Sequence, residues 1–260
     1  MQNLDLKFRK IIKIIYLTIL LFYSFNSYGY EKIHVAVASN FIEPLNLIKK
    51  KFSKKNKISF NISTGSTAKL FAQILNKAPI DIFLSADQLT IKKIPDNQKI
   101  KVSKFTYAIG SLVIFPRTRF DNEVKFENIL LKRLSNKIVI ANPKFSPYGS
   151  ASKQVLESLG ILSLFENKII LASNINQVSS FIYSGNVDLG IISISDKLKL
   201  NKYELGYFKE IPQNLYTQIN QDAILLENAK QNHNAKLFFN FLKSYEAKKI
   251  IKSFGYRITD

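Results

Sequence analysis

Four short segments of the sequence place small polar residues where a strand pattern gives way to a helix pattern. They are Ser39-Asn40, Ser66-Thr67, Tyr148-Gly149-Ser150 and Asn174-Ile175-Asn176. The start of a helix carries backbone N–H groups without partners and about half a positive charge. Such a start attracts anions, and nearby serine and threonine hydroxyls add further donors. We therefore predict that these segments bind a small anion without a lysine or arginine in direct contact.

Local capping offers an alternative explanation for each segment taken alone. Serine, threonine and asparagine are preferred at helix starts because their side chains accept hydrogen bonds from first-turn N–H groups. Asn40, with Glu43 three residues later, also resembles a capping box. The anion hypothesis therefore depends on all four segments meeting in one place, since a cap needs no ligand.

The elements that must bring these segments together alternate between strands and helices. Apolar runs that predict strands cover 33–38, 58–62, 80–84, 107–115, 138–141, 169–171 and 189–194. Periodic apolar positions between most of these runs predict helices. This order is typical of α/β proteins with mostly parallel sheets, in which ligands bind beyond the carboxyl ends of the strands.

The number of elements fits two lobes, each a mostly parallel sheet flanked by helices. We expect the first lobe at 30–108 and 219–260 and the second at 109–218, with the ligand in the cleft between them. No low-complexity linker divides the chain, so we expect it to cross between the lobes within strands. Two helix starts from each lobe would then face the cleft.

Residues 1–29 differ from the rest of the chain. Four basic residues between positions 7 and 13 precede an apolar stretch from 14 to 23, and the small residues Ser27 and Gly29 suit signal peptidase. The apolar stretch is short for a membrane span, which needs about 20 residues. We predict a signal peptide at 1–29, cleaved after Gly29, and a periplasmic mature protein.

The composition narrows the classes of site that the chain can hold. The sequence contains no cysteine, which rules out disulfides, thiolate metal sites, catalytic thiols and a lipid anchor on cysteine. The formal net charge of +19 favours anionic partners. Most of the lysines are scattered along the chain, and export argues against a nucleic-acid partner, so we predict no nucleic-acid binding.

Signals for an enzyme or a metal site are weak. The sequence has neither a G-x-S-x-G nor an H-E-x-x-H motif, and its two histidines, His34 and His233, are far apart. Asp81 and Asp87 flank a strand end, where a structural role is the simpler interpretation. We predict no catalysis, no metal ligands and no cofactor. The alternatives outside the binding class are an exported hydrolase with Ser39 as nucleophile and a basic adhesin that holds an acidic polymer.

Six segments, in the same order, resemble the periplasmic molybdate-binding proteins of ABC transporters. They cover 35–41, 65–70, 78–88, 140–143 with 147–149, 184–190 and 221–226. The stretch 78–88, with the sequence APIDIFLSADQ, is the most specific of them. The resemblance extends over nearly all of the mature chain and implies a type II periplasmic binding protein fold.

The resemblance also implies roles for the residues at the helix starts. It implies oxyanion contacts through the side chain and backbone of Ser39 and through the Ser66-Thr67 turn. It implies backbone N–H contacts from Tyr148 and Ile175. Asn40, beside Ser39, is a secondary candidate.

The sequence departs from the family pattern at two of the ligand positions. Many members have a second serine where this chain has Thr67, and threonine keeps a hydroxyl donor. Some members use a tyrosine hydroxyl where this chain has Ser193, so Ser193 is a secondary candidate.

The helix starts and the resemblance together predict a binding protein that captures molybdate or tungstate. The oxyanion would be held through its oxygens and passed to the membrane permease subunits of an ABC transporter. A protein for sulfate or another oxyanion is the alternative within the same class. We expect the protein to be a monomer.

Overall fold

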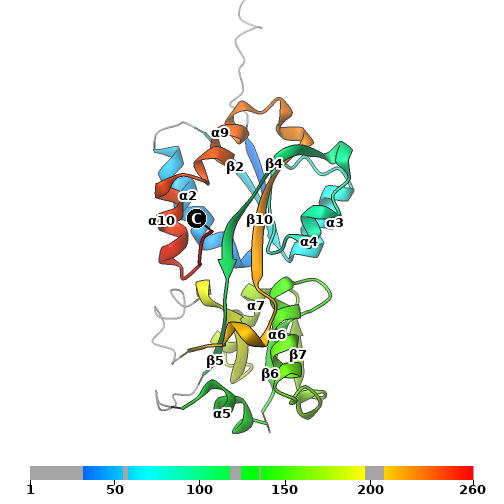
Figure 1. The fold of residues 1–260 in the computed structure, drawn as a ribbon, viewed down its shortest axis with the longest axis vertical. Coiled ribbons are helices and arrows are strands. Elements are labelled where there is room, and N and C mark those ends of the chain that lie inside the picture. Colours follow the sequence, from blue (N-terminus) through cyan, green and yellow to red (C-terminus); the bar gives the residue numbers. More distant parts are fainter. Residues whose placement is uncertain (1–31, 55–57, 118–123, 135, 197–207, 260) are drawn as a thin grey trace, which may run out of the picture.

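The computed structural model describes residues 32–54, 58–117, 124–134, 136–196 and 208–259 (Figure 1). Within these ranges the chain forms two five-stranded sheets with helices packed against them, and Figure 1 shows the two resulting lobes stacked along the long axis. The predicted α/β class with two lobes is confirmed. The predicted signal peptide at 1–29 lies outside the described residues.

The first lobe, in the upper half of Figure 1, is built on a sheet with the strand order β2-β1-β3-β10-β4. Its strands are β1 (Ile33–Ala38), β2 (Phe60–Gly65), β3 (Ile82–Leu84), β4 (Lys99–Gly110) and β10 (Ile219–Leu226). β1 is parallel to β2 and β3, as the strand–helix alternation predicts, whereas β10 is antiparallel to β3 and β4. The carboxyl ends of β1 and β2 therefore lie at the same edge of the sheet.

Helices cover both faces of this sheet. They are α2 (Ile42–Ser53), α3 (Thr67–Leu75), α4 (Leu89–Lys92), α9 (His233–Phe241) and α10 (Tyr245–Ser253), with the 3-10 turns η1 (Ser39–Phe41), η2 (Asp96–Gln98) and η6 (Glu227–Lys230). Val35 and Val37 of β1 pack in the core under α2, α9 and α10, while Ala36 packs under α3 and α4. Burial on both faces explains the unbroken apolar run.

The second lobe is built on a sheet with the strand order β7-β6-β8-β5-β9. Its strands are β5 (Leu112–Pro116), β6 (Ile138–Ala141), β7 (Ile169–Ala172), β8 (Leu189–Ser193) and β9 (Lys209–Glu210). β6 is parallel to β7 and β8, and β5 is antiparallel to β8. The remaining elements are α5 (Phe126–Leu131), α6 (Pro147–Ser158), α7 (Ile175–Tyr183), η3 (Ser163–Phe165), η4 (Ile194–Asp196) and η5 (Gln213–Leu215).

The chain passes between the lobes where β4 leads into β5 and where η5 leads into β10 (Figure 1). The single strand predicted over 107–115 is wrong in this respect: it is divided at Ser111 into β4 and β5, which belong to different sheets. Gly110, the last residue of β4, lies at a point where there is no room for a side chain. A Cβ atom added there would lie 2.0 Å from the Tyr148 hydroxyl oxygen.

Candidate ligand-binding site

The four segments predicted to bind an anion lie where the lobes meet, in two facing pairs. The first pair is η1, which begins at Ser39, and α7, which begins at Ile175. The two elements belong to different lobes and are in contact. Ser39 and Ile175 are both buried, so water has little access to this pair of helix starts.

The second pair is the start of α3 and the loop that leads into α6. The backbone N–H of Ala68 donates a hydrogen bond to the Phe145 carbonyl, with an N···O distance of 3.1 Å across the two lobes. Phe145 lies just before α6, whose second residue is Tyr148. The structure therefore brings all four predicted segments to the boundary between the lobes.

Ser66 is a residue of this site whose side chain has an unpaired polar atom. It precedes α3 with an extended backbone, it is 3% exposed, and its side chain does not cap the helix. Among the described residues, its hydroxyl is one of three buried side-chain polar atoms without a hydrogen-bond partner. Another is Oδ1 of Asn176, in the first turn of α7. Buried polar atoms normally have partners, so the Ser66 hydroxyl is a donor available to a ligand.

Thr67, the first residue of α3, uses its side chain differently. Its hydroxyl oxygen accepts a hydrogen bond from the Ala86 N–H at 3.2 Å. A hydroxyl carries one proton besides its acceptor sites, so Thr67 can still donate that proton.

Side-chain capping accounts for part of the other two helix starts. Ser146 caps α6 by accepting from the Gly149 N–H, and Asn174 caps α7 by accepting from the Gln177 N–H at 3.1 Å. These caps satisfy the third N–H group of each helix and leave the earlier ones. In α6 the first residue is a proline without an N–H. The first N–H of α6 is therefore that of Tyr148, and the first of α7 is that of Ile175.

Asn40 does not form the predicted capping box. α2 begins at Ile42 and no side chain caps it, so that prediction is wrong. The Asn40 amide nitrogen instead donates to Gln221 Oε1 at 2.8 Å and to the Tyr256 hydroxyl at 2.9 Å, with the Tyr148 hydroxyl at 3.4 Å. Because both amide protons are engaged within the protein, the backbone N–H is the donor that Asn40 can offer to a ligand.

Ser193, the last residue of β8, is fully buried and also bonded within the protein. Its hydroxyl lies 2.9 Å from the Ser195 hydroxyl and accepts from the Ser195 N–H at 3.3 Å. The Ser195 hydroxyl donates to the Asn40 carbonyl at 2.9 Å. Ser193 is thus placed in a hydrogen-bonded cluster that links η4 of the second lobe to η1 of the first.

Sequence reasoning missed most of this interlobe cluster, which contains Asn40, Tyr107, Tyr148, Ser193, Ser195, Gln221 and Tyr256. Gln221 is fully buried near the start of β10 and bonds to side chains of both lobes. Gln221 lies between Asn220 and Asp222 in a polar stretch of β10, so its residue type gave no signal of this role. No pattern in the sequence indicated a role for Tyr256, because its partner Asn40 lies 216 residues earlier in the chain.

The interlobe cluster is electrically neutral over the physiological pH range. Burial raises the pKa of Tyr107 and of Tyr148 well above the usual value of 10, and it raises the pKa of Tyr256 to about 12. All three phenols therefore keep their protons. No group of histidine, cysteine and acidic residues in the described part of the chain could hold a metal ion.

Two hollows adjoin the boundary between the lobes. A groove of about 590 Å³ is lined by residues of both lobes, among them Thr67, Ala68 and Phe145, and by the exposed lysines Lys93 and Lys144. The second hollow, about 650 Å³, lies where the segment after α10 meets β9 and η5. Its lining contains none of the predicted site residues.

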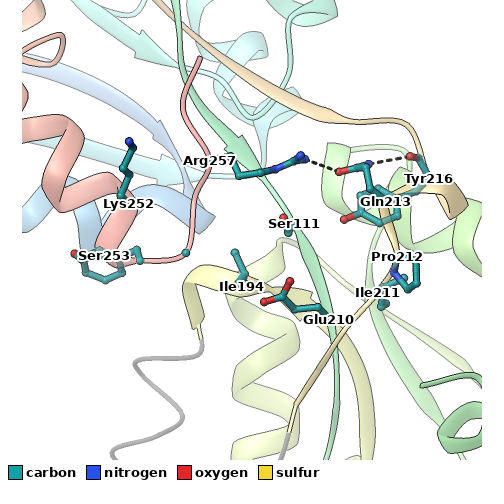
Figure 2. Close-up of a pocket in the computed structure, with 12 residues that line it drawn as sticks. Ser111, Ile194, Glu210, Ile211, Pro212, Gln213, Tyr216, Lys252, Ser253 and Arg257 are labelled. Carbon is teal, nitrogen blue, oxygen red and sulfur yellow. Dashed lines mark hydrogen bonds between the residues drawn. The ribbon is translucent and has the colours of Figure 1, made fainter. Parts of the chain in front are cut away.

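Figure 2 shows that Arg257 reaches across this second hollow toward η5. Its guanidinium donates to Gln213 Oε1 at 2.8 Å. Arg257 also pairs through its backbone with Ile109 of β4. The segment that follows α10 therefore ties the first lobe to the second outside the interlobe cluster.

Comparison with known protein families accounts for this architecture. The family described as bacterial extracellular solute-binding protein matches residues 33–257, a range that includes every strand named above. The chain belongs to this family. Two facing lobes with a site at their boundary suit a solute-binding protein, because such a site can open and close around its ligand.

Named relatives narrow the comparison. The molybdate-binding protein ModA of Azotobacter vinelandii is 35% identical over 227 residues, which cover 86% of this chain and 89% of that protein. ModA of Rhodobacter capsulatus is 34% identical over 224 residues, which cover 85% and 86%. The solved structure of the Azotobacter vinelandii periplasmic molybdate-binding protein matches with a TM-score of 0.81 at 31% identity, over 88% of this chain and 100% of that one. The chain is homologous to ModA, as the six segments predicted.

The chain belongs to a family of solute-binding proteins, which argues against the two alternatives outside that class, an exported hydrolase and a basic adhesin. The geometry also argues against a hydrolase with Ser39 as nucleophile, because His34 lies on β1 five residues before Ser39. At about 3.3 Å per residue the two are about 16 Å apart, too far for proton transfer.

No helix in the described residues is long and apolar enough to span a membrane.

Proposed function

We propose that this solute-binding protein captures a tetrahedral oxyanion, molybdate or tungstate, between its lobes. One observation carries the proposal: the Ser66 hydroxyl is buried without a partner at a helix start that faces the other lobe. Homology to ModA supplies the ligand class. An ABC transporter's membrane permease subunits are the proposed recipients.

The proposed contacts come from both lobes. The first lobe contributes the hydroxyl and N–H of Ser39, the N–H of Asn40 and the Ser66-Thr67 turn. The second lobe contributes the N–H groups of Tyr148 and Ile175. Ser193 would act through the interlobe cluster rather than at the ligand, since its hydroxyl is bonded to the protein.

Neutral donors suit a fully ionised oxyanion. Helix starts stabilise a dianion by their N–H groups and dipoles, and their effect is strongest where water is excluded. A protonated oxyanion such as hydrogen phosphate carries a donor proton that needs an acceptor, and a lining of donors offers none. Discrimination against sulfate depends on size, because sulfate and molybdate present the same charge and the same kind of oxygen.

Capture involves closure of the cleft. The proposed lobes are 30–108 with 219–260 and 109–218, joined by the two crossings between the sheets. In this proposal the interlobe bond from Ala68 to Phe145 forms when the lobes close. We further propose a monomeric protein that is exported to the periplasm by a signal peptide at 1–29.

A thermal-shift titration of the chain purified from a bacterial periplasm tests the function. A ligand at 100 times its Kd adds about 2.7 kcal/mol to the folded state. For a chain of this size, that raises Tm by about 5–10 °C. Molybdate and tungstate should give this shift and phosphate none, at both low and high salt. Mass spectrometry of the same sample shows whether residues 1–29 have been removed.

Two variants sharpen this test. Ser66→Ala should weaken molybdate binding, because it removes the buried donor. Ser253→Ala should not, because that exposed hydroxyl bonds within α10. A larger shift with sulfate than with molybdate would assign the site to sulfate. Absence of a shift with every tetrahedral anion would refute the oxyanion function.

A further inference from the structure

Gln221 is a buried polar side chain at the point where β10 enters the first lobe. It is 0% exposed, and the register of β10 against β4 shifts just after it. Its Oε1 accepts from Asn40 Nδ2 at 2.8 Å and from the Tyr107 hydroxyl at 3.1 Å. Its Nε2 donates to the Tyr148 hydroxyl at 3.1 Å. One amide therefore joins side chains of the first lobe to a side chain of the second.

The two residues linked in this way both belong to segments that are proposed to bind the ligand. Asn40 follows Ser39 in η1, on the first lobe. Tyr148 lies in the first turn of α6, on the second lobe. Their side chains turn away to Gln221 while their backbone N–H groups remain for the ligand. The amide of Gln221 therefore fixes how these two backbone segments lie relative to each other.

Burial makes the hydrogen bonds of Gln221 costly in free energy to break. A buried polar group that loses its partner carries the full cost of its desolvation, whereas an exposed group turns to water. The tie between Arg257 and Gln213 is exposed, so water competes for it. The bond of Gln221 to Tyr148 is thus a stronger link between the lobes than the bond of Arg257 to Gln213.

We propose that Gln221 is a positioning residue for ligand capture, because its amide holds the Asn40 and Tyr148 segments in the closed arrangement. Closure of the lobes and alignment of their N–H groups then occur as a single event. Gln221 does not touch the ligand and acts through these two residues. The inference rests on the proposed function, since the aligned groups are the proposed ligand donors.

Tyr107 and Tyr148 provide a matched comparison. Both are buried, and each has a hydroxyl 3.1 Å from the Gln221 amide. Tyr107 belongs to the same lobe as the strand segment that carries Gln221, whereas Tyr148 belongs to the other lobe. Replacing either tyrosine by phenylalanine removes one hydroxyl from the amide, but only Tyr148→Phe removes a bond between lobes.

The affinity experiment measures molybdate binding by titration calorimetry on the wild-type chain and three variants. Loss of one such hydrogen bond corresponds to roughly 5- to 10-fold in Kd. Tyr148→Phe should raise Kd by that factor through faster dissociation, and Gln221→Met should raise it further. Tyr107→Phe should lower Tm as much as Tyr148→Phe while leaving Kd within about twofold. Equal effects of the two tyrosine variants on Kd would overturn the proposal.

A second measurement does not depend on the ligand. The native chain has no cysteine, so spin labels can be placed by Lys93→Cys and Lys144→Cys, at exposed positions of both lobes that line the groove. Without ligand, Tyr148→Phe and Gln221→Met should shift the distance distribution toward larger separations, and Tyr107→Phe should not. An unchanged distribution in Tyr148→Phe would overturn the proposal. Failure of the wild-type chain to bind molybdate would instead refute the proposed function, and this measurement would still decide the role of Gln221.

Discussion

Gly110 lies where a side chain would strike the interlobe cluster, so Gly110→Ala is a direct test of that cluster. A Cβ atom built on Gly110 lies 2.0 Å from the Tyr148 hydroxyl oxygen and 2.9 Å from Gln221 Nε2. Ordinary contact begins at 3.4 Å, so the hydroxyl must move by about 1.4 Å. Its bonds to Gln221 and Asn40 are already 3.1 and 3.4 Å long and cannot survive such a shift.

The expected cost follows from these two effects. A buried amide left without an acceptor costs about 1–3 kcal/mol, and overpacking adds a similar amount. We expect Gly110→Ala to lower the free energy of unfolding by about 3 kcal/mol, which corresponds to about 6–12 °C in Tm for a chain of this size. The substitution destabilises the closed form, in which the lobes bind the ligand together, so the Kd for molybdate should rise at least 10-fold.

Gly160→Ala is the control for this prediction. Gly160 has φ +68°, and a Cβ atom there would meet nothing within 4 Å. Alanine in this left-handed conformation costs about 1–2 kcal/mol, but it touches no interlobe contact. Calorimetric titration and thermal unfolding of both variants should therefore show two lowered Tm values and only one weakened affinity. An unchanged Kd in Gly110→Ala would refute the role of the cluster in closure.

Two further predictions concern the boundary between the lobes and alkaline pH. Ala68→Pro removes the N–H that bonds to the Phe145 carbonyl, in a first helical turn that tolerates proline. It should raise Kd for molybdate about 5- to 10-fold, whereas Lys69→Pro, one residue on, should not, and equal values from titration calorimetry would contradict this. Between pH 10 and 12 the unfolded chain loses the Tyr256 proton that the folded chain keeps. Stability should therefore fall with rising pH, by about 1.4 kcal/mol per unit for this group. In urea titrations, the loss between pH 9 and pH 11 should be smaller in Tyr256→Phe, and an equal loss would count against the buried phenol.

The fold was largely predictable because its central strands are buried on both faces. Strands such as β1 and β6 are almost entirely apolar, and such runs between periodic helices indicate parallel sheets. The helix starts at Ser39, Ser66 and Ile175 were predictable for the same local reason. Small polar residues at the end of an apolar run mark the change from strand to helix.

The uses of several side chains were not predictable, because they depend on residues far away in the sequence. Asn40 bonds to Gln221 and Tyr256, which are 181 and 216 residues away, and no local spacing records such a pair. The division of the strand at Ser111 was missed for a related reason. The pattern along 107–115 stays apolar on both sides, and the break arises from the passage of the chain between two sheets.

The position of β10 within its sheet also sets an order of folding. β5 to β9 come from one uninterrupted stretch of sequence, so their sheet needs no residue beyond 210 to pair its strands. The other sheet does, because β10 lies between β3 and β4 and follows them by more than a hundred residues in the sequence. A chain that lacks β10 exposes two unpaired strand edges, on β3 and β4, which are sites of aggregation. Completion of the N-terminal half of this protein therefore waits for its C-terminal end.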